Sequence, residues 1–344
     1  MTNTYATAEE CRPLFALMDQ VKELAPWEWM TETEIFGVQA ADAAEPDYVS
    51  VMGMAGEHYA VALYLGNRAL TQFMQMETSQ PFANPLDLLL IPQLQASFED
   101  RNTLTDKDRT MLKTLGLKYR GRNAWPQLRA QQPACLPWYI ETTDVPRIAN
   151  ALEQLLVVAP RVKSDPALLR PKGKRNLFLR KTDGQEWVDA TVSPKLSTQQ
   201  DIPIQLDAEL VETVRELPRV TNVLEVDLDL LPTPIGETNQ RPYFPYSLLV
   251  VESESGMVLE SDILSPLPSL SDMWAEVPNR FLGTMAKLGV LPQQIHVQSN
   301  TLAALLGGLE QLDLQIELVD ELSSLNQAKD GLLGFLSRGS DMFG

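Results

Sequence analysis

In the last third of the chain, apolar spacing and turn residues predict three strands followed by a helix, a strand, a helix, a strand and a helix. The first strand, 220–231, alternates between apolar and polar residues, as a strand with two different faces does. A hairpin follows it around Ser255 and Gly256, and runs with helical spacing separate the later strands. The ranges are strands 246–252, 256–264, 294–298 and 314–319, and helices 270–288, 301–311 and 325–337. This order predicts an α/β domain with a mixed five-stranded sheet and flanking helices.

The first 160 residues mix helices and strands differently. Thr7 and Glu10 have capping-box spacing at the start of an amphipathic run that ends before Pro26. Valine and tyrosine residues, which favour strands, occur on both sides of Gly56, and this predicts a hairpin that turns at the glycine. The expected elements are helices 7–24, 67–77, 105–116 and 143–158, a hairpin 48–66, a buried strand 86–91 that 94–99 either extends or pairs beside, and a loop 118–138. We therefore predict an α+β domain at 1–160.

Between these domains lies a basic, proline-bearing segment at 164–175, which is typical of a linker. An Asp183-Gly184 pair between two alternating runs then predicts a second hairpin. We assign 161–206 to a connector that carries this hairpin, and 207–344 to the C-terminal domain.

Charge is unevenly distributed along a chain whose net charge is −18. Residues 101–182 carry 17 basic and 6 acidic residues, whereas both flanking regions are strongly acidic. The acidic flanks disfavour general nucleic-acid binding, because they repel phosphate. The basic region either neutralises the acidic flanks within the molecule or binds an anion.

The cysteine content and the length of the apolar segments indicate where in the cell the protein is expected. The two cysteines, Cys11 and Cys135, do not form a disulfide framework or a CxxC pair. No apolar run has the length of a membrane helix, and the N-terminus lacks the pattern of a secretory signal. These features predict a soluble cytoplasmic protein without membrane contacts.

Three carboxylates on the strand 220–231 are the clearest candidates for chemistry. Glu225, Asp227 and Asp229 alternate with leucine and valine, so they share one face, with neighbours about 7 Å apart. Two such carboxylates suit a hard divalent cation, which prefers oxygen ligands. The alternative is a solvated outer face of the sheet. Asp227 and Asp229 are thus candidate metal ligands, and all three acids are candidate catalytic residues.

The segments VLEVDLDLLP, RPYFPYSLLVVESESGMVLESDILSPLPS and LPQQIHVQSN resemble the core of DDE transposases and integrases, which have an RNase H-like fold. The resemblance spans roughly 219–335 and implies that Asp227 matches the first catalytic aspartate of that family. The second family acid falls on Gln298, and the third belongs to the last helix, where Asp330 is nearby. An amide does not replace a charged ligand, so the resemblance implies an inactive relative.

The whole chain also resembles an uncharacterised bacterial family built from two adjacent domains of unknown function. The segments PWEW, YVSVMGMAGEHYAVALYLG, LKTLGLKYRGRNAWPQLR and PWYI carry this resemblance. It implies no activity.

A second candidate site lies in the basic region, where Arg120, Arg122 and Trp125 occur close together, flanked by Lys118 and Arg129. Guanidinium groups beside an indole suit a phosphate, a carboxylate or a stacked base. Alternatively, the tryptophan fills a core and the arginines pair with surface acids.

Three functions follow from these patterns. The preferred hypothesis is a non-catalytic protein that acts through contacts with a protein partner and needs no cofactor. The alternatives are a metal-dependent nuclease or phosphoesterase that uses Asp227 with a divalent cation, and a module that binds an anionic ligand or nucleic acid through 101–182.

Overall fold

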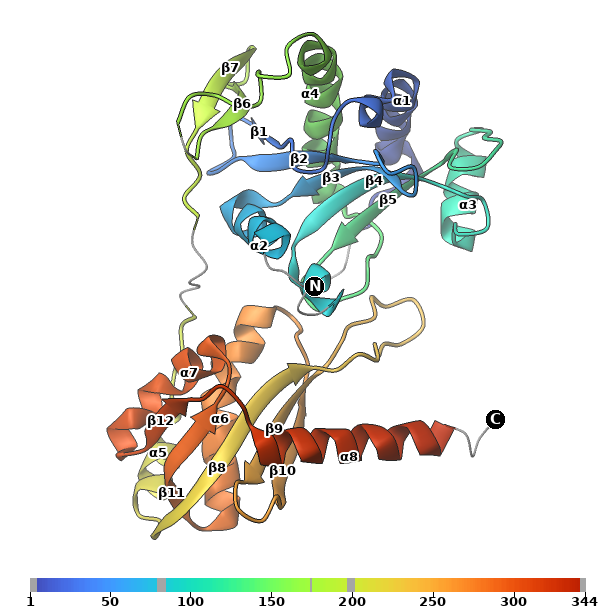
Figure 1. Ribbon diagram of the computed structural model, residues 1–344. Coiled ribbons are helices and arrows are strands. Elements are labelled where there is room, and N and C mark those ends of the chain that lie inside the picture. The colour runs from blue at the N-terminus through green and yellow to red at the C-terminus, as the bar shows by residue number, and fades with distance from the viewer. Residues whose placement is uncertain (1–4, 79–84, 174, 197–201, 341–344) are drawn as a thin grey trace. The chain divides into compact units, whose positions relative to one another are not determined.

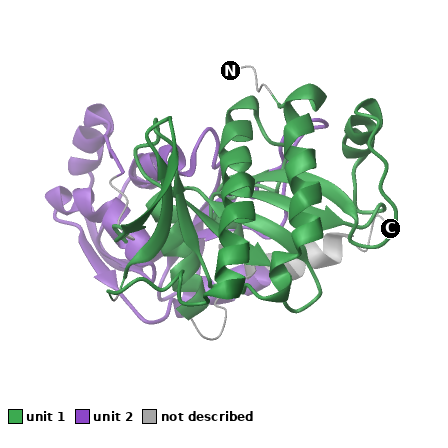
Figure 2. Ribbon diagram, turned by 90° about the horizontal axis from the view of Figure 1, so that it is seen from above, with its two compact units in different colours: residues 1–199 green, residues 200–344 purple. Residues whose placement is uncertain are grey.

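The computed structural model describes residues 5–78, 85–173, 175–196 and 202–340, without the side chains of 85–87 and 332–340. The chain forms two compact units, residues 1–199 and 200–344 (Figures 1 and 2). Both units are mixed α/β structures, and each is considered by itself.

The first unit contains a seven-stranded sheet in the order β5-β4-β3-β2-β1-β6-β7. Neighbouring strands are antiparallel except for β1 and β6, which are parallel. The strands are β1 (Phe36–Gln39), β2 (Asp47–Met52), β3 (Tyr59–Tyr64), β4 (Gln93–Glu99), β5 (Trp125–Gln131), β6 (Leu177–Thr182) and β7 (Trp187–Val192).

Helices cover both faces of this sheet. The two long helices α1 (Ala8–Leu24) and α4 (Val145–Ser164) lie together on one face, whereas α2 (Gly66–Thr78) lies on the other (Figure 1). The main core joins α1 and α4 to strand residues such as Val49, Leu63 and Leu94, while Tyr48 and Tyr64 pack towards α2. The short helix α3 (Asp106–Thr114) precedes β5.

Local capping explains where two of these helices begin. Thr7 and Glu10 form a reciprocal capping box at α1, and Thr105 and Asp108 form one at α3. Each box satisfies backbone N–H groups that have no partner inside the helix. The helices predicted from 7 and from 105 are confirmed.

Two predicted elements of this unit are wrong. The apolar run 86–91, predicted as a buried strand, forms the 3-10 helix η2 (Pro85–Leu90), and the Leu88 side chain is exposed. The region 118–138, predicted as a loop, contains the edge strand β5, whose partner is β4. The short strand β1 was not predicted either.

The hairpin that we assigned to a connector belongs to the first sheet instead. Strand β6 pairs with β1, and Phe178 and Leu179 of β6 are buried. A Cβ atom on Gly37 of β1 would lie 2.8 Å from Cδ1 of Leu179, which is too close for a side chain. The glycine therefore allows the Leu179 side chain to pack against β1. The first unit therefore extends beyond 160 and includes the hairpin.

The second unit contains a five-stranded mixed sheet in the order β10-β9-β8-β11-β12. Strand β8 is antiparallel to β9, β9 is antiparallel to β10, and β11 is parallel to both β8 and β12. The strands are β8 (Arg219–Leu230), β9 (Tyr246–Glu252), β10 (Val258–Leu264), β11 (Leu291–Val297) and β12 (Gln315–Leu318). The predicted five-stranded mixed sheet is confirmed.

Helices flank this second sheet on opposite sides. Helix α6 (Leu270–Leu288) packs beside α5 (Ala208–Arg215) and α7 (Asn300–Leu306), and its Arg280 and Lys287 pair with Asp262 and Glu260 of β10. Helix α8 (Ser323–Ser340) begins against β8 and β9 on the other face (Figure 1). In the described part of the chain, no helix is long and apolar enough to cross a bilayer.

Candidate functional site

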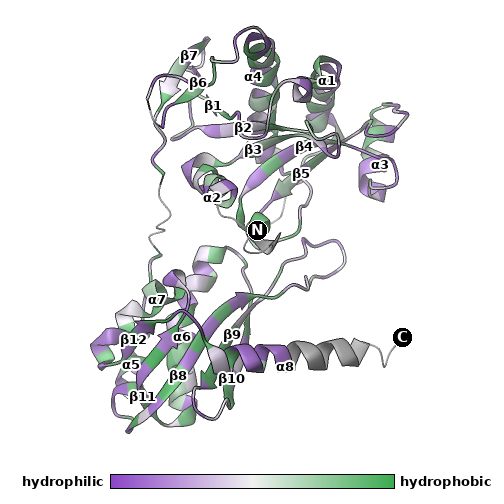
Figure 3. Ribbon diagram, viewed as in Figure 1, coloured by the Kyte–Doolittle hydropathy of each residue, from purple (hydrophilic) through white to green (hydrophobic). Residues whose placement is uncertain are grey.

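The three carboxylates of β8 face the start of α8 and not open solvent. Hydrophobic and hydrophilic residues alternate along β8 (Figure 3), so Glu225, Asp227 and Asp229 share one face as predicted. Glu225 is 5% exposed and Asp227 is 9% exposed, which excludes a fully solvated outer face at these two positions. Only Asp229 retains substantial exposure, at 44% of its side chain.

A lysine from α8 occupies the space between the two aspartates. Nζ of Lys329 lies 2.6 Å from Oδ2 of Asp227 and also contacts Oδ2 of Asp229. The ammonium group donates to both carboxylates, which is the electrostatic role that a divalent cation would have there. The pair thus has a counter-cation within its own chain.

Glu225 holds the beginning of α8 on the sheet. Its Oε2 accepts a hydrogen bond from the backbone N–H of Leu325 at 2.7 Å, and its Oε1 accepts one from Oγ of Ser253 at 3.0 Å. A carboxylate near a helix N-terminus satisfies free N–H groups and complements the helix dipole. Leu325 and Lys329 are four residues apart and therefore lie on the same side of the helix.

An apolar contact fixes the same end of α8. Leu322 and Leu325 are fully buried against Leu249 and Val251 of β9. The side chain of Lys329 is therefore positioned by a helix start that is anchored by both packing and hydrogen bonds.

The ionisation of this cluster follows from burial and neighbouring charge. Burial, together with the nearby charge of Asp227, raises the pKa of Asp229 above its ordinary value. Burial by itself would lower the pKa of Lys329, but its hydrogen bonds to Asp227 and Asp229 raise that pKa above the usual value. The lysine is thus fully charged at neutral pH, and two carboxylates share one ammonium group.

The remaining positions suggested by the transposase resemblance do not join the cluster. Gln298 lies just after β11 and donates a hydrogen bond to the carbonyl oxygen of Asp320 at 2.7 Å. Asp330 is exposed, because the helix register presents Lys329 to the sheet. Among the residues that the structure describes, no three His, Cys, Asp or Glu side chains are grouped so that they would hold a metal ion.

Glu252, at the end of β9, is also separate from the aspartates. It pairs with Leu224, whereas Val251 pairs with Glu225, so Glu252 and Glu225 lie on opposite faces of the sheet. Its carboxylate accepts hydrogen bonds from the side chain and backbone of Ser255 and from Asn222, which lower its pKa to about 2. Glu252 therefore organises the turn into β10.

Sequence reasoning did not identify Lys329. The residue lies about a hundred positions from the aspartates, and only the docked helix brings them together. One signal was present in the sequence, although we did not use it: Leu322, Leu325 and Lys329 follow helical spacing, so the lysine lies on the same side of the helix as the two leucines.

The second candidate site, in the basic region, is only partly assembled. Arg120 and Arg122 are exposed, and within the described residues neither forms an ion pair. Trp125 is half-buried, with Tyr119 at 6.1 Å between ring centroids and the guanidinium of Arg101 at 5.8 Å from its ring. The indole thus serves the packing of the loop onto β5.

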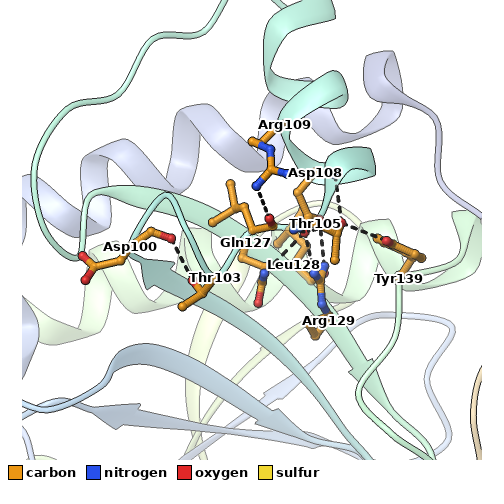
Figure 4. Close-up of polar contacts among 10 residues, drawn as sticks. Asp100, Thr103, Thr105, Asp108, Arg109, Gln127, Leu128, Arg129 and Tyr139 are labelled. Carbon is orange, nitrogen blue, oxygen red and sulfur yellow. Dashed lines mark hydrogen bonds and ion pairs between the residues drawn. The ribbon is translucent and has the colours of Figure 1, made fainter.

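Arg129 has a structural role (Figure 4). Its Nη1 and Nη2 donate to Oδ1 and Oδ2 of Asp108 at 2.9 and 2.6 Å, and both side chains are 11% exposed. Although burial raises the pKa of Asp108, its bonds to Arg129 and Thr105 bring that pKa below the ordinary value. Thr105 also bonds to the hydroxyl of Tyr139 at 2.9 Å. This network fastens α3 to β5.

Two family models match the chain, one in each unit. Residues 12–180 match a domain of unknown function (DUF7309), and residues 210–333 match a second domain of unknown function (DUF6930). The chain is therefore composed of two domains of unknown function, consistent with the uncharacterised two-domain family that it resembles. No curated protein matches it.

Proposed function

We propose that this is a non-catalytic protein that acts through contacts with other proteins, and that its second unit is a degenerate relative of the RNase H-like fold. The sheet order supports the second part of the proposal. The sheet order β10-β9-β8-β11-β12 means that the first strand in the sequence, β8, lies at the centre of the sheet. Strands β8, β9 and β10 form an antiparallel meander, whereas β11 and β12 run parallel to β8 on its other side. This topology agrees with the resemblance to DDE transposases, whose first aspartate corresponds to Asp227.

The contact of Lys329 with both aspartates carries the proposal that the protein is non-catalytic. A divalent ion at Asp227 and Asp229 would have to displace a charged ammonium group that contacts both carboxylates. The helix that carries this lysine is held on the sheet by the packing of Leu322 and Leu325 against β9. The alternative, a metal-dependent nuclease or phosphoesterase, requires the ammonium group to leave before both aspartates are available.

Calorimetry tests the proposal directly. We expect titration of Mn²⁺ into the wild type and into Asp227→Asn to give the same heat, because the ammonium group already occupies the pair. Asp262→Asn is a matched control, since Asp262 lies on the same sheet but contacts Arg280. Neither the wild type nor Asp227→Asn should hydrolyse bis-p-nitrophenyl phosphate, single-stranded RNA or duplex DNA with Mg²⁺ or Mn²⁺.

A different outcome is easily recognised. Saturable heat or turnover that is present in the wild type and in Asp262→Asn, but lost in Asp227→Asn, would establish the metal-dependent alternative instead.

A further inference from the structure

Five exposed basic side chains lie on α3 and on the segments directly before and after it. We call them the basic knob: Arg101, Lys113, Lys118, Arg120 and Arg122. Two hydrogen bonds from backbone N–H groups join the segments before and after α3, since the N–H of Asn123 donates to Oδ1 of Asp100 at 2.8 Å and that of Ala124 to the carbonyl oxygen of Glu99 at 3.1 Å. These bonds place the segment that carries Arg101 beside the segment that carries Arg122.

The knob differs in its partners from five other arginines of the first unit. Arg109, Arg129, Arg147, Arg161 and Arg180 each form an ion pair with an aspartate. In contrast, in the part of the chain that the structure describes, no knob residue forms one, and Arg101 instead lies over the ring of Trp125. A chain with 46 acidic residues thus leaves this group of cations unneutralised.

Nearby acids support the loop without neutralising it. Asp100 accepts from the Asn123 backbone, and Asp19 accepts from the hydroxyl of Tyr119 at 3.3 Å. Nζ of Lys22 donates to the carbonyl oxygen of Asn123 at 3.0 Å. The loop is held in place by these contacts, so a partner would meet cations on a preformed support.

The surroundings of the knob distinguish between two kinds of anionic partner. Single-stranded nucleic acid binding combines cations with open aromatic faces on which bases stack. Here Tyr119 and Arg101 already lie against Trp125. The net charge of −18 repels any long polyanion, nucleic acid included, so the knob suits a short anionic segment.

We infer that the basic knob is a docking surface for an acidic, Asp- or Glu-rich segment of a partner protein. This inference rests on the proposed function, because it names the surface and the chemistry of the protein contact. Guanidinium and ammonium groups pair with carboxylates through charge-assisted hydrogen bonds, which would supply both affinity and orientation.

Fluorescence anisotropy with a labelled polyglutamate peptide tests the inference on the full chain. We expect the double variant Arg120→Ala/Arg122→Ala to bind about threefold to tenfold more weakly, because each exposed charge pair contributes modestly. The matched control is Lys172→Ala/Arg175→Ala, which removes the same charge from another exposed loop of the same unit and should bind as the wild type does. Binding should weaken as salt is added.

Three results would overturn the inference: no binding of the peptide, equal weakening by both double variants, or displacement of the peptide by single-stranded RNA at lower concentration than by unlabelled polyglutamate. The last result would assign the knob to nucleic acid. None of them depends on Asp227, so the metal titration separately decides whether the non-catalytic proposal fails.

Discussion

At the scale of single residues, the central finding is a lysine side chain at the candidate metal site that the sequence indicated. Two carboxylates on one strand repel each other, and the repulsion grows as water is excluded. Lys329 relieves this repulsion from within the chain and links α8 to the sheet. Burying such an ion pair costs desolvation energy, so its net contribution to stability is small. Removing only the lysine, in contrast, leaves two neighbouring carboxylates without a counter-ion, and we expect this to destabilise the fold.

Replacement of this lysine should destabilise the second unit. Lys329→Met leaves Asp227 and Asp229 without a counter-cation, and we expect the free energy of unfolding to fall by about 1–3 kcal/mol, less than for a fully buried pair because Asp229 and Lys329 are partly exposed. Urea denaturation measures this, with Gln327→Met on the exposed side of α8 as the control. The loss should shrink at low pH, since protonation of Asp229 removes the repulsion. An unchanged stability at neutral pH would contradict a structural role for the pair.

The sequence identified one half of this cluster and not the other. Strand periodicity was sufficient to place Glu225, Asp227 and Asp229 on one face, because the side-chain period of a strand is local. The choice between a metal ion, solvent and a lysine depends on which helix docks there and in which register. A rotation that replaced Lys329 by Asp330 would change the chemistry completely. The spacing of the leucines before Lys329 indicates which side of the helix is apolar, but not which strands that side packs against.

At the scale of elements, the turn from β9 into β10 shows how one side chain organises a hairpin. Glu252 accepts hydrogen bonds from Ser255 and Asn222, and these bonds favour its charged form. Its pKa falls from an ordinary value of 4.5 to about 2. A carboxyl whose pKa is lowered on folding stabilises the fold above its unfolded pKa, and this stabilisation is lost as pH falls through the folded value.

Glu252→Gln should therefore alter the pH dependence of stability in one window. We expect the variant to be less stable than the wild type at neutral pH, and the difference to disappear between pH 4.5 and about 2. Urea midpoints across this range measure the effect, with the exposed Glu254→Gln as the matched control. A stability difference that persisted unchanged at pH 2 would assign the effect to packing and not to the carboxylate charge.

Elements whose limits depend on local chemistry were predictable, whereas those that depend on distant partners were not. The capping boxes at Thr7 and Thr105 gave correct helix starts, since both partners lie within one turn. The run 86–91 has the composition of a buried strand, yet β4 forms the ladder beside β3 and leaves this run as a 3-10 helix. Strand β5 was not predicted because it is an edge strand whose polar face carries arginine and glutamine side chains.

At the scale of the whole molecule, the sequence indicated two units but not where the first one ends. The Asp183-Gly184 turn identified the β6–β7 hairpin, but a hairpin signal does not say which sheet receives it. The parallel pairing of β6 with β1 joins segments about 140 residues apart in the chain. The ion pair of Arg161 of α4 with Asp189 of β7 and the hydrogen bond from Arg180 of β6 to Gln154 of α4 then fix the hairpin against the first core.

This assignment predicts how fragments of the chain behave. A fragment 1–199 should unfold cooperatively, as should 200–344, because each contains a complete compact unit. A fragment 1–173 keeps all of α4 but loses β6 and β7, so β1 becomes an unpaired edge and the core loses Phe178 and Leu179. Burial of two such side chains is worth about 3–6 kcal/mol, and the shorter fragment should therefore be less stable by at least about 3 kcal/mol or aggregate through the exposed edge.

Thermal and urea denaturation of the fragments, followed by circular dichroism and light scattering, measures this difference. The variant Val188→Thr in 1–199 is a suitable control, because Val188 is exposed on the outer strand β7 and its change should have little effect. If 1–173 unfolds as sharply and at the same urea concentration as 1–199, the hairpin contributes nothing to the first unit. The segment 161–206 would then behave as the independent connector that its composition first indicated.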